Sequence, residues 1–404
     1  MAPVTLLNFH LVDVIRGEVH GDATLRVEDE RIAGIGGDAL AGGELDLGGM
    51  YLVPGLIDVH SHLSFPATVD LPQVVNRELP ALLAIRAVAA ARATLTAGVT
   101  TVRDGASTSY IDIAVRDAVD RGYIPGPRVS ACGYAIRMTG GHGDPPTSTL
   151  VHVDQPGRVD GADEVRKAAR LNFKMGADHL KVFASGGLAG GHTHPGAAQL
   201  TQEEMAAAVD VARSAGGTVM AHSYSPESCR RAILAGVDSL EHACLIDDAG
   251  LALAKEHGTF VVPTLTPFWR GVQKVSQGPA DERAIRSAGV YEAAVEMVRR
   301  AYAAGVSIAM GTDTGTVNCP HGENLREIAL LAEAGMSGID ALRTATIQAA
   351  RLMKRSADVG SIELGKYADL VGVTDNPLEH PEMFGDPAVV RFVMKGGSVV
   401  RDDR

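Results

Sequence analysis

The chain has 404 residues, of which 46% are hydrophobic and only 4% are aromatic, and its formal net charge is -12 at pH 7. This length predicts one large α/β unit accompanied by a minor domain. The negative charge argues against nucleic acid or an anionic membrane as a partner. No apolar run is long enough to span a bilayer, so we expect neither a nucleic-acid-binding protein nor a membrane protein.

The N-terminal stretch MAPVTLLNFHLVDV carries Asp13 and lacks a basic segment, so we expect no signal peptide. Four cysteines are scattered along the chain without any CxxC pair: Cys132, Cys229, Cys244 and Cys319. This pattern indicates reduced thiols rather than a disulfide framework and predicts a cytoplasmic protein.

Both ends of the chain consist of short strand-like segments separated by glycine turns. At the N-terminal end these are residues 5–14, 23–36 and 42–49, and at the C-terminal end they are residues 360–374 and 389–400. Pairing between the two sets would form one small β domain.

Between these ends, eight short apolar runs alternate with alanine-rich helical segments. The expected strands cover residues 55–60, 99–104, 128–133, 179–184, 218–223, 239–243, 259–265 and 307–313, and typical helices cover residues 80–98, 162–176, 201–216 and 225–236. Such alternation indicates parallel strands joined by helical crossovers, and eight units favour a closed (β/α)8 barrel. A doubly wound sheet is the alternative, although no GxGxxG or GxxxxGK[ST] motif follows an early strand.

Polar residues occur where several of these strands end, which is the active-site edge of a parallel barrel. His60 and His62 are two residues apart, so alternation along a strand places both on one face. Neutral imidazoles at this spacing suit Zn²⁺. A single HxH pair is a weak signal, but ligand-type residues at four further strands strengthen it. We therefore predict that His60 and His62 bind metal.

Lys181, in the segment HLKVFASGG, is the most informative residue of the chain. A lysine ammonium repels metal ions, but reaction with carbon dioxide gives a carbamate whose two anionic oxygens can bridge two divalent ions. A buried cation without a partner is costly. The alternatives are an ion-paired structural lysine and a Schiff base. The surrounding histidines favour the carbamate.

Three more ligand candidates end strands: His222, His242 and Asp313. The alternative for the histidines is a satisfied position in the core, and for Asp313 it is a cap of the following segment. As a ligand that also contacts a water molecule, Asp313 would be able to shuttle a proton. Together with His60, His62 and Lys181, these residues predict a two-metal hydrolytic site.

Loops beside these strands carry further candidates. His142 lies in the glycine-rich loop RMTGGHGDPP, and Tyr224 shares a face with His222, so both are candidate substrate contacts or else parts of a turn and the core. Arg103 and Asp104 are expected to pair with each other inside the barrel. His192 and His194, in GGHTHPG, are interpreted as a loop feature or, alternatively, as a lid or a substrate contact.

These motifs identify a resemblance to the amidohydrolase superfamily over nearly the whole chain. The segments VPGLIDVHSH, GVTTVRD, HLKVFASGG, AHSY, EHA, GTD and GSIELGKYADLV look like its motifs. MTGGHGD, HSYSPES and HGENLREIALLAEAGMSGIDALRTATIQAARLM are most similar to the imidazolonepropionase-like group, which includes metal-dependent prolidases and carboxypeptidase-type dipeptidases. Imidazolonepropionase itself lacks a bridging lysine, so Lys181 argues against that activity. The histidines of the loop GLAGGHTHPGAAQL depart from the family pattern.

The resemblance implies a (β/α)8 TIM barrel of residues 53–359 and a β-sandwich of residues 1–52 and 360–404. It also implies two divalent metal ions, most often zinc. His60, His62 and Asp313 would hold the first ion, and His222 and His242 the second. A carbamylated (N6-carboxy) Lys181 and a hydroxide would bridge them.

The resemblance also implies catalysis and a substrate class. The bridging hydroxide would attack a scissile carbonyl, and Asp313 would pass a proton to the leaving amine. Residues that match His142 and Tyr224 contact substrate in the related dipeptidases. We therefore expect hydrolysis of an amide bond next to a free carboxylate, in Xaa-Pro or other dipeptides or in N-acyl amino acids, including amide-linked toxins and xenobiotics. The related dipeptidases also suggest a homo-oligomer.

Three alternatives remain open from the sequence. A deaminase, a cyclic-amide hydrolase or a lactonase of the phosphotriesterase type would use the same scaffold, and such deaminases usually bind one metal and need no bridging lysine. A non-enzymatic scaffold would have lost its ligands, whereas every ligand position is filled here. An imine-forming barrel enzyme would use Lys181 as its nucleophile.

Overall fold

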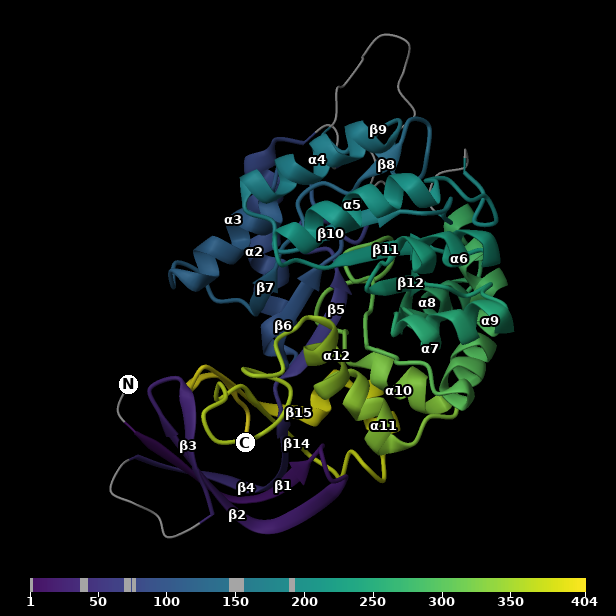
Figure 1. Cartoon of the computed structure of the whole chain (residues 1–404). Coiled ribbons are helices and arrows are strands. Elements are labelled where there is room, and N and C mark those ends of the chain that lie inside the picture. The colour runs from purple at the N-terminus through teal and green to yellow at the C-terminus, as the bar shows by residue number, and fades with distance from the viewer. Residues whose placement is uncertain (1–2, 37–42, 69–73, 75–77, 145–155, 189–192) are drawn as a thin grey trace.

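The computed structural model describes residues 3–36, 43–68, 74, 78–144, 156–188 and 193–404. Figure 1 shows two parts: strands from both ends of the chain form the lower part, and the larger upper part has strands surrounded by helices. The fold is therefore a mixed α/β fold, as the alternation of strands and helices in the sequence predicts.

A seven-stranded sheet in the order β16-β15-β14-β4-β1-β2-β3 joins the two ends of the chain. Its strands are β1 (Val4–Asp13), β2 (Glu18–Glu28), β3 (Arg31–Ile35), β4 (Gly43–Pro54), β14 (Leu370–Val373), β15 (Val390–Lys395) and β16 (Ser398–Asp402). Strand β4 is the link, because it pairs in parallel with β1 and antiparallel with β14. A separate apolar cluster, which includes Leu6, Leu52 and Phe392, packs within this part.

The strands of the upper part form two parallel sheets. One consists of β5 (Leu56–Ser61), β6 (Val99–Asp104) and β7 (Arg128–Ser130), and the other of β10 (Leu180–Phe183), β11 (Val219–Ser223), β12 (Ser239–His242) and β13 (Phe260–Val262). A small pair, β8 (Arg137–Met138) and β9 (Arg158–Val159), lies beside them. Single parallel bridges continue the pairing from Ile136 to Val182, from Val261 to Ile308 and from Ser61 to Thr314.

The eighth expected strand, residues 307–313, is not a continuous strand among the described residues. Only Ile308 and the following Thr314 form bridges. The amide of Met310 donates to the carbonyl of Thr344 rather than to a neighbouring strand, and Asp313 has a φ of 56°. These two features interrupt the regular ladder, so the pairing seen here is two linked sheets, and no closed barrel is detected in the described part of the chain.

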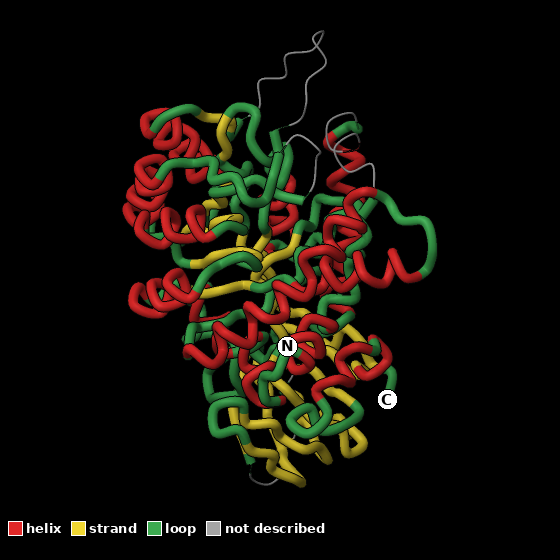
Figure 2. The backbone as a smooth tube through the Cα atoms, turned by 90° about the vertical axis from the view of Figure 1, so that its right-hand side faces the viewer, coloured by secondary structure: helices red, strands yellow, loops and turns green. Residues whose placement is uncertain are grey.

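Helices surround these sheets, as the side view in Figure 2 shows. They are α2 (Pro80–Thr96), α3 (Ile111–Asp120), α4 (Ala162–Met175), α5 (Gln202–Ser214), α6 (Pro226–Ala235), α7 (Asp248–His257), α8 (Leu265–Ser276), α9 (Glu282–Ala304), α10 (Arg326–Glu333), α11 (Gly338–Thr344) and α12 (Ile347–Leu352), with 3-10 turns η1 (Pro381–Gly385) and η2 (Pro387–Val389). No helix in the described ranges combines the length and apolarity needed to cross a membrane.

Local signals explain where several helices begin and end. Thr201 and Glu204 form a capping box at the start of α5, and Ser225 caps α6, which has Pro226 in its first turn and ends at Gly236 in the left-handed conformation. These helices pack their apolar faces on the sheets in one large core. Because the strands within each sheet are parallel, the residues that end them lie along the same edge.

Candidate metal centre and active site

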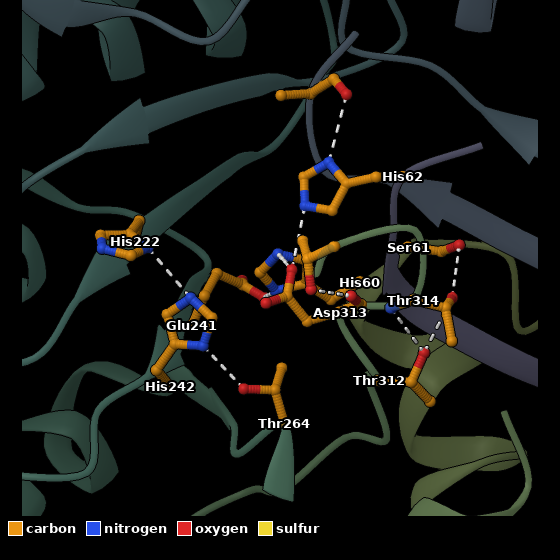
Figure 3. A network of polar contacts seen from close by, with 12 residues as sticks. His60, Ser61, His62, His222, Glu241, His242, Thr264, Thr312, Asp313 and Thr314 are labelled. Atoms are coloured by element: carbon orange, nitrogen blue, oxygen red, sulfur yellow. Dashed lines mark hydrogen bonds and ion pairs between the residues drawn. The ribbon is translucent and has the colours of Figure 1, made fainter. Parts of the chain in front are cut away.

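The structure brings all six expected ligand residues together at this edge. His60 lies in β5 and His62 follows it, Lys181 lies in β10, His222 and His242 lie in β11 and β12, and Asp313 ends the eighth segment. Each is buried, with at most 8% of its surface exposed. Figure 3 shows the four histidines and Asp313 converging, with Glu241 behind them.

Three of these residues point bare acceptor atoms at one another. Nδ1 of His62 lies 3.2 Å from the carbonyl oxygen of Ala106, and Nδ1 of His60 lies 2.7 Å from Oε2 of Glu241. Because a carbonyl only accepts, we infer that His62 carries its proton on Nδ1. We infer the same tautomer for His60 from the nearness of the Glu241 carboxylate, although the two atoms are not aligned as a hydrogen bond. Their Nε2 lone pairs then face Oδ1 of Asp313, at 3.5 Å from His60 and 3.1 Å from His62.

Lone pairs at these distances repel unless a cation lies between them. The candidate ligand atoms of His60, His62 and Asp313 all lie within 4.8 Å of one another, and two imidazoles with one carboxylate form a donor set that suits zinc. The residues present therefore fit a divalent metal ion.

A second pair of imidazoles lies beside this trio. Nε2 of His222 lies 3.2 Å from the carbonyl oxygen of Gly186, which leaves Nδ1 of His222 bare, 2.9 Å from Nε2 of His242. Nδ1 of His242 is 2.6 Å from Oγ1 of Thr264. Two nitrogen atoms are fewer than the four ligands of a tetrahedral zinc ion, so a metal at this pair would need a further ligand.

Lys181 lies next to both groups. Its Nζ is 3.3 Å from Nε2 of His60, and among the described residues no carboxylate oxygen lies within ion-pair distance of it. Burial lowers the pKa of Lys181, although the charges of Glu241 and Asp313 oppose this effect. Burial thus favours the neutral amine, which is the form that reacts with carbon dioxide.

The electrostatics of the site favour the protonation states that metal binding needs. Burial lowers the pKa of His60 and His222, helped by Lys181 at His60 and by His142 at His222, and burial lowers the pKa of His242 to about 3. Neutral imidazoles and an ionised carboxylate are the ligand forms of these groups.

The backbone is strained or tightly packed at several ligands. His242 and Asp313 have φ values of 70° and 56°, a region that costs a non-glycine residue about 1–3 kcal/mol. A Cβ on Gly105 or Gly311 would lie 2.8 or 2.7 Å from His60, so only glycine fits there. Strain of this kind is concentrated at functional sites.

Two residues that support the ligands were not identified from the sequence. Glu241 fixes His60, and Thr264 fixes His242. The pairing expected between Arg103 and Asp104 is wrong: Nη2 of Arg103 donates to Oε1 of Glu241 at 3.0 Å, whereas Asp104 accepts from the amides of Leu63 and Ala106. An acidic residue directly before His242 was the available signal for Glu241.

The two expected substrate contacts lie beside the second imidazole pair. The ring of His142 stacks on His222 with a centroid distance of 4.4 Å, and the ring of Tyr224 stacks on His242 at 5.0 Å. A Cβ on Gly187 would lie 2.3 Å from the His142 ring, so this glycine allows the loop to approach. Burial raises the pKa of Tyr224 well above its ordinary value, which keeps its hydroxyl protonated.

Of the other histidine pair, His192 and His194, the structure describes only His194. His194 is exposed, and its Nδ1 accepts a hydrogen bond from the amide of Gly196 at 3.0 Å. This contact is that of a loop residue. His192 lies outside the described residues.

Comparison with known proteins identifies the family. The family model described as "Amidohydrolase family" matches residues 51–400. The chain belongs to this family. The match covers the six ligand candidates, His142 and Tyr224.

Relatives of this amidohydrolase share its full length. Ochratoxinase from Aspergillus niger is 31% identical over 435 residues, which cover 99% of this chain and 87% of the relative. The solved structure of a Xaa-Pro dipeptidase with bound methionine is 32% identical with a TM-score of 0.89, covering 98% of this chain and 99% of that one. The solved structure of a prolidase complexed with N-methylphosphonate-L-proline is 32% identical with a TM-score of 0.91. The match covers 99% of this chain and 100% of that one.

Proposed function

We propose that this amidohydrolase is a binuclear zinc enzyme that hydrolyses an amide bond next to a free carboxylate. The observation that carries the proposal is the convergence of the bare Nε2 atoms of His60 and His62 on Oδ1 of Asp313, beside a second imidazole pair and a buried lysine. Neighbours that include ochratoxinase and prolidase structures support amide hydrolysis.

In this proposal, His60, His62 and Asp313 hold one ion, and His222 and His242 hold the other. Carbamylated Lys181 supplies the bridging ligand that the second pair lacks: the neutral amine forms a C–N bond to carbon dioxide and releases a proton. Two divalent ions held there would supply Lewis acidity, which lowers the pKa of a water molecule and polarises a carbonyl.

Proton transfer from the attacking water to the leaving amine is assigned to Asp313. Asp313 lies beside His60 and His62, and as an ionised ligand it would be able to accept a proton from the attacking water. We propose that it then donates this proton to the leaving amine, which is the role of a general base followed by a general acid. The strained backbone of Asp313 fixes the direction of its carboxylate.

His142 and Tyr224 are the proposed substrate contacts. Their rings stack on His222 and His242, so a group bound by them lies next to the second metal position. An imidazole and a protonated phenol can donate hydrogen bonds to a substrate carboxylate or to an oxyanion. Suitable substrates are Xaa-Pro and other dipeptides and N-acyl amino acids, including amide-linked toxins or xenobiotics.

A deaminase, a cyclic-amide hydrolase or a lactonase of the phosphotriesterase type is the second candidate function on the same scaffold. The buried Lys181 beside the histidines favours a bridged two-metal centre over the single metal that is usual for such deaminases. Counting the metal ions separates a single-metal deaminase from the proposed centre.

For the fold, we propose that the two parallel sheets and the residues 307–313 segment together form a (β/α)8 barrel of residues 53–359. Backbone hydrogen bonds from Val261 to Ser307 and from Thr312 to His60 support this arrangement. We propose that residues 1–52 and 360–404 form a β-sandwich domain, supported by the sheet that joins both termini.

We also propose a cytoplasmic homo-oligomer that acts on small molecules. All four cysteines are free and buried, which suits a reducing compartment. The oligomer is proposed by analogy with related dipeptidases.

A matched substrate panel tests the proposed function. Metal-loaded protein is assayed with dipeptides and N-acyl amino acids, each with a free C-terminal carboxylate and as the corresponding amide or ester. We expect the free acids to be cleaved at the amide bond and the blocked compounds to react about 100-fold more slowly, as the loss of one or two hydrogen bonds predicts. If blocked and free compounds are cleaved equally well, recognition of a free carboxylate is wrong, and an esterase or lactonase function should be assigned instead.

A further inference from the structure

A second cavity, of about 880 Å³, lies at the opposite end of the strands from the metal centre. Its lining includes Arg128 at the start of β7, Asp178 just before β10 and Thr218 just before β11, together with Lys395 of β15 and Ser398 of β16. It therefore lies between the amino ends of the parallel strands and the sheet formed by the chain termini, the two parts seen one above the other in Figure 1.

The lining of this cavity is basic although the chain is acidic. Six of its residues are cationic and three are anionic; the cationic ones are Arg103, Arg116, Arg128, Lys354, Arg355 and Lys395. The whole chain, by contrast, carries a formal charge of -12. The four arginines form ion pairs with Glu241, Asp178, Asp369 and Asp358. Lys354 and Lys395 are the cations that remain, and Glu30 and Asp120 belong to the same lining.

Two of these cations have no acidic partner among the described residues. Lys354 donates only to the carbonyl of Gly217 at 3.4 Å, and Lys395 only to the carbonyl of Gly126 at 2.7 Å. Each ammonium has three N–H donors; Lys354 is exposed to solvent and Lys395 is half-buried, so both have donors available to a ligand that enters the cavity. Burial and the neighbouring Arg128 lower the pKa of Lys395 to about 8, although the nearby Asp369, Asp120 and Glu30 oppose this effect.

Arg103 gives an independent indication of a ligand at the inner end of the cavity. Its side chain is 1% exposed and lines the cavity. Nε donates to the carbonyl of Val59 at 2.8 Å, and Nη2 donates to Ser239 and Glu241 at 3.0 Å each. Nη1 is buried and has no acceptor in the described part of the chain. Leaving such a donor without an acceptor is costly, and more so for a charged group.

We propose that this cavity is a binding site for the oxyanion of a small metabolite, a carboxylate or a phosphate, which accepts hydrogen bonds from Nη1 of Arg103 and from Lys354 and Lys395. This inference does not depend on the reaction proposed above. It assigns a use to the buried Nη1 of Arg103, which has no acceptor among the described residues.

The occupant would be connected to the metal centre through two side chains. The guanidinium of Arg103 holds Oε1 of Glu241, and Oε2 of Glu241 lies 2.7 Å from Nδ1 of His60. An anion on Nη1 therefore contacts the group that positions a proposed ligand. This chain of contacts makes the cavity a candidate site for regulation by an anion.

Anion titration of the metal-loaded protein tests the proposal. Phosphate and succinate are titrated by calorimetry at constant ionic strength, into the wild type and into the double variant Lys354→Ala/Lys395→Ala. Lys255→Ala is the matched control, because Lys255 is exposed and also donates to a carbonyl, that of Ala304, at 2.7 Å. We expect a saturable site that the double variant weakens at least tenfold and the control leaves unchanged. The tighter of the two anions identifies the preferred group.

Crystals soaked in selenate locate the site, because anions can also bind to the metal ions. We expect anomalous density within hydrogen-bond distance of Nη1 of Arg103. Selenate found only at the metal centre or on the outer surface, a cavity that holds only water, or affinities equal in the double variant and the wild type would each overturn the proposal.

Discussion

Oε2 of Glu241 lies 2.7 Å from Nδ1 of His60, and both side chains are almost completely buried. The other oxygen of Glu241 accepts from Arg103 and from Ser239. Glu241 is thereby held by hydrogen bonds on one side and contacts His60 on the other. A carboxylate in this position sets the tautomer of an imidazole and directs its Nε2 lone pair, which is a recurrent arrangement behind metal-binding histidines.

The first prediction is that Glu241→Gln weakens metal binding about 10–100-fold, because an amide holds the imidazole less firmly and presents a donor to Arg103. Competition with a chromogenic chelator measures this affinity. Glu327→Gln is the matched control, since Glu327 is equally buried but accepts from Leu265 and Thr266 instead of a histidine. Wild-type affinity in Glu241→Gln would show that Glu241 does not position His60.

Lys181→Ala is expected to lose metal and activity together. Without the lysine there is no carbamate, and the pair His222 and His242 keeps only two nitrogen ligands. Acetate or propionate should restore part of both properties by occupying the position of the carbamate. Metal analysis and activity are measured with and without the acid. An active, metal-replete wild type whose crystal density shows an unmodified lysine would refute the carbamate.

His142→Ala and Tyr224→Phe should retain their metal ions but use substrate poorly. Their rings stack on the proposed ligands without supplying a ligand atom in this account. The loss of one donor to a carboxylate or oxyanion costs about 2–4 kcal/mol, which corresponds to roughly a hundredfold in kcat/KM. Metal analysis and steady-state kinetics are compared for each variant. If both variants have a normal kcat/KM on free-acid substrates, these residues do not bind the substrate.

We predict that the free energy of unfolding depends on pH because of the buried carboxyl group of Glu327. Burial raises its pKa from 4.5 to about 7, so the folded chain holds this proton more tightly than the unfolded chain does. The resulting stabilisation is complete below pH 4.5 and is lost as the pH rises through 7. The Tm of the wild type should therefore decrease more between pH 5 and pH 7 than that of Glu327→Gln. Parallel Tm profiles for the two proteins would show that Glu327 does not titrate in this way.

The sequence predicted the family and most of the fold because the signals concerned are local. Strand alternation, capping residues and short motifs each depend on a few neighbouring residues. Most of the six ligand candidates end strands or follow them, and Lys181 lies within β10. Parallel strands then bring these candidates to one edge, so the spacing of His60 and His62 was sufficient to place both on one face.

What the sequence did not predict depends on contacts between distant segments. Arg103 reaches Glu241, 138 positions away, instead of its neighbour Asp104, because both side chains point into the space between the two sheets. The eighth expected strand is also not regular. The amide of Met310 donates a hydrogen bond to the carbonyl of Thr344, and Asp313 adopts a left-handed backbone conformation. Neither the pairing partner nor the backbone angle can be derived from residue type alone.

The most direct test of the central claim is the number of metal ions needed for activity. Protein freed of metal is titrated with zinc while amide hydrolysis of a free-acid substrate is recorded, and the metal content is determined by elemental analysis. We expect activity to rise until about two ions are bound per chain, because six candidate ligand residues are more than one tetrahedral zinc ion needs. Full activity at a reproducible stoichiometry of one ion per chain would contradict the binuclear centre.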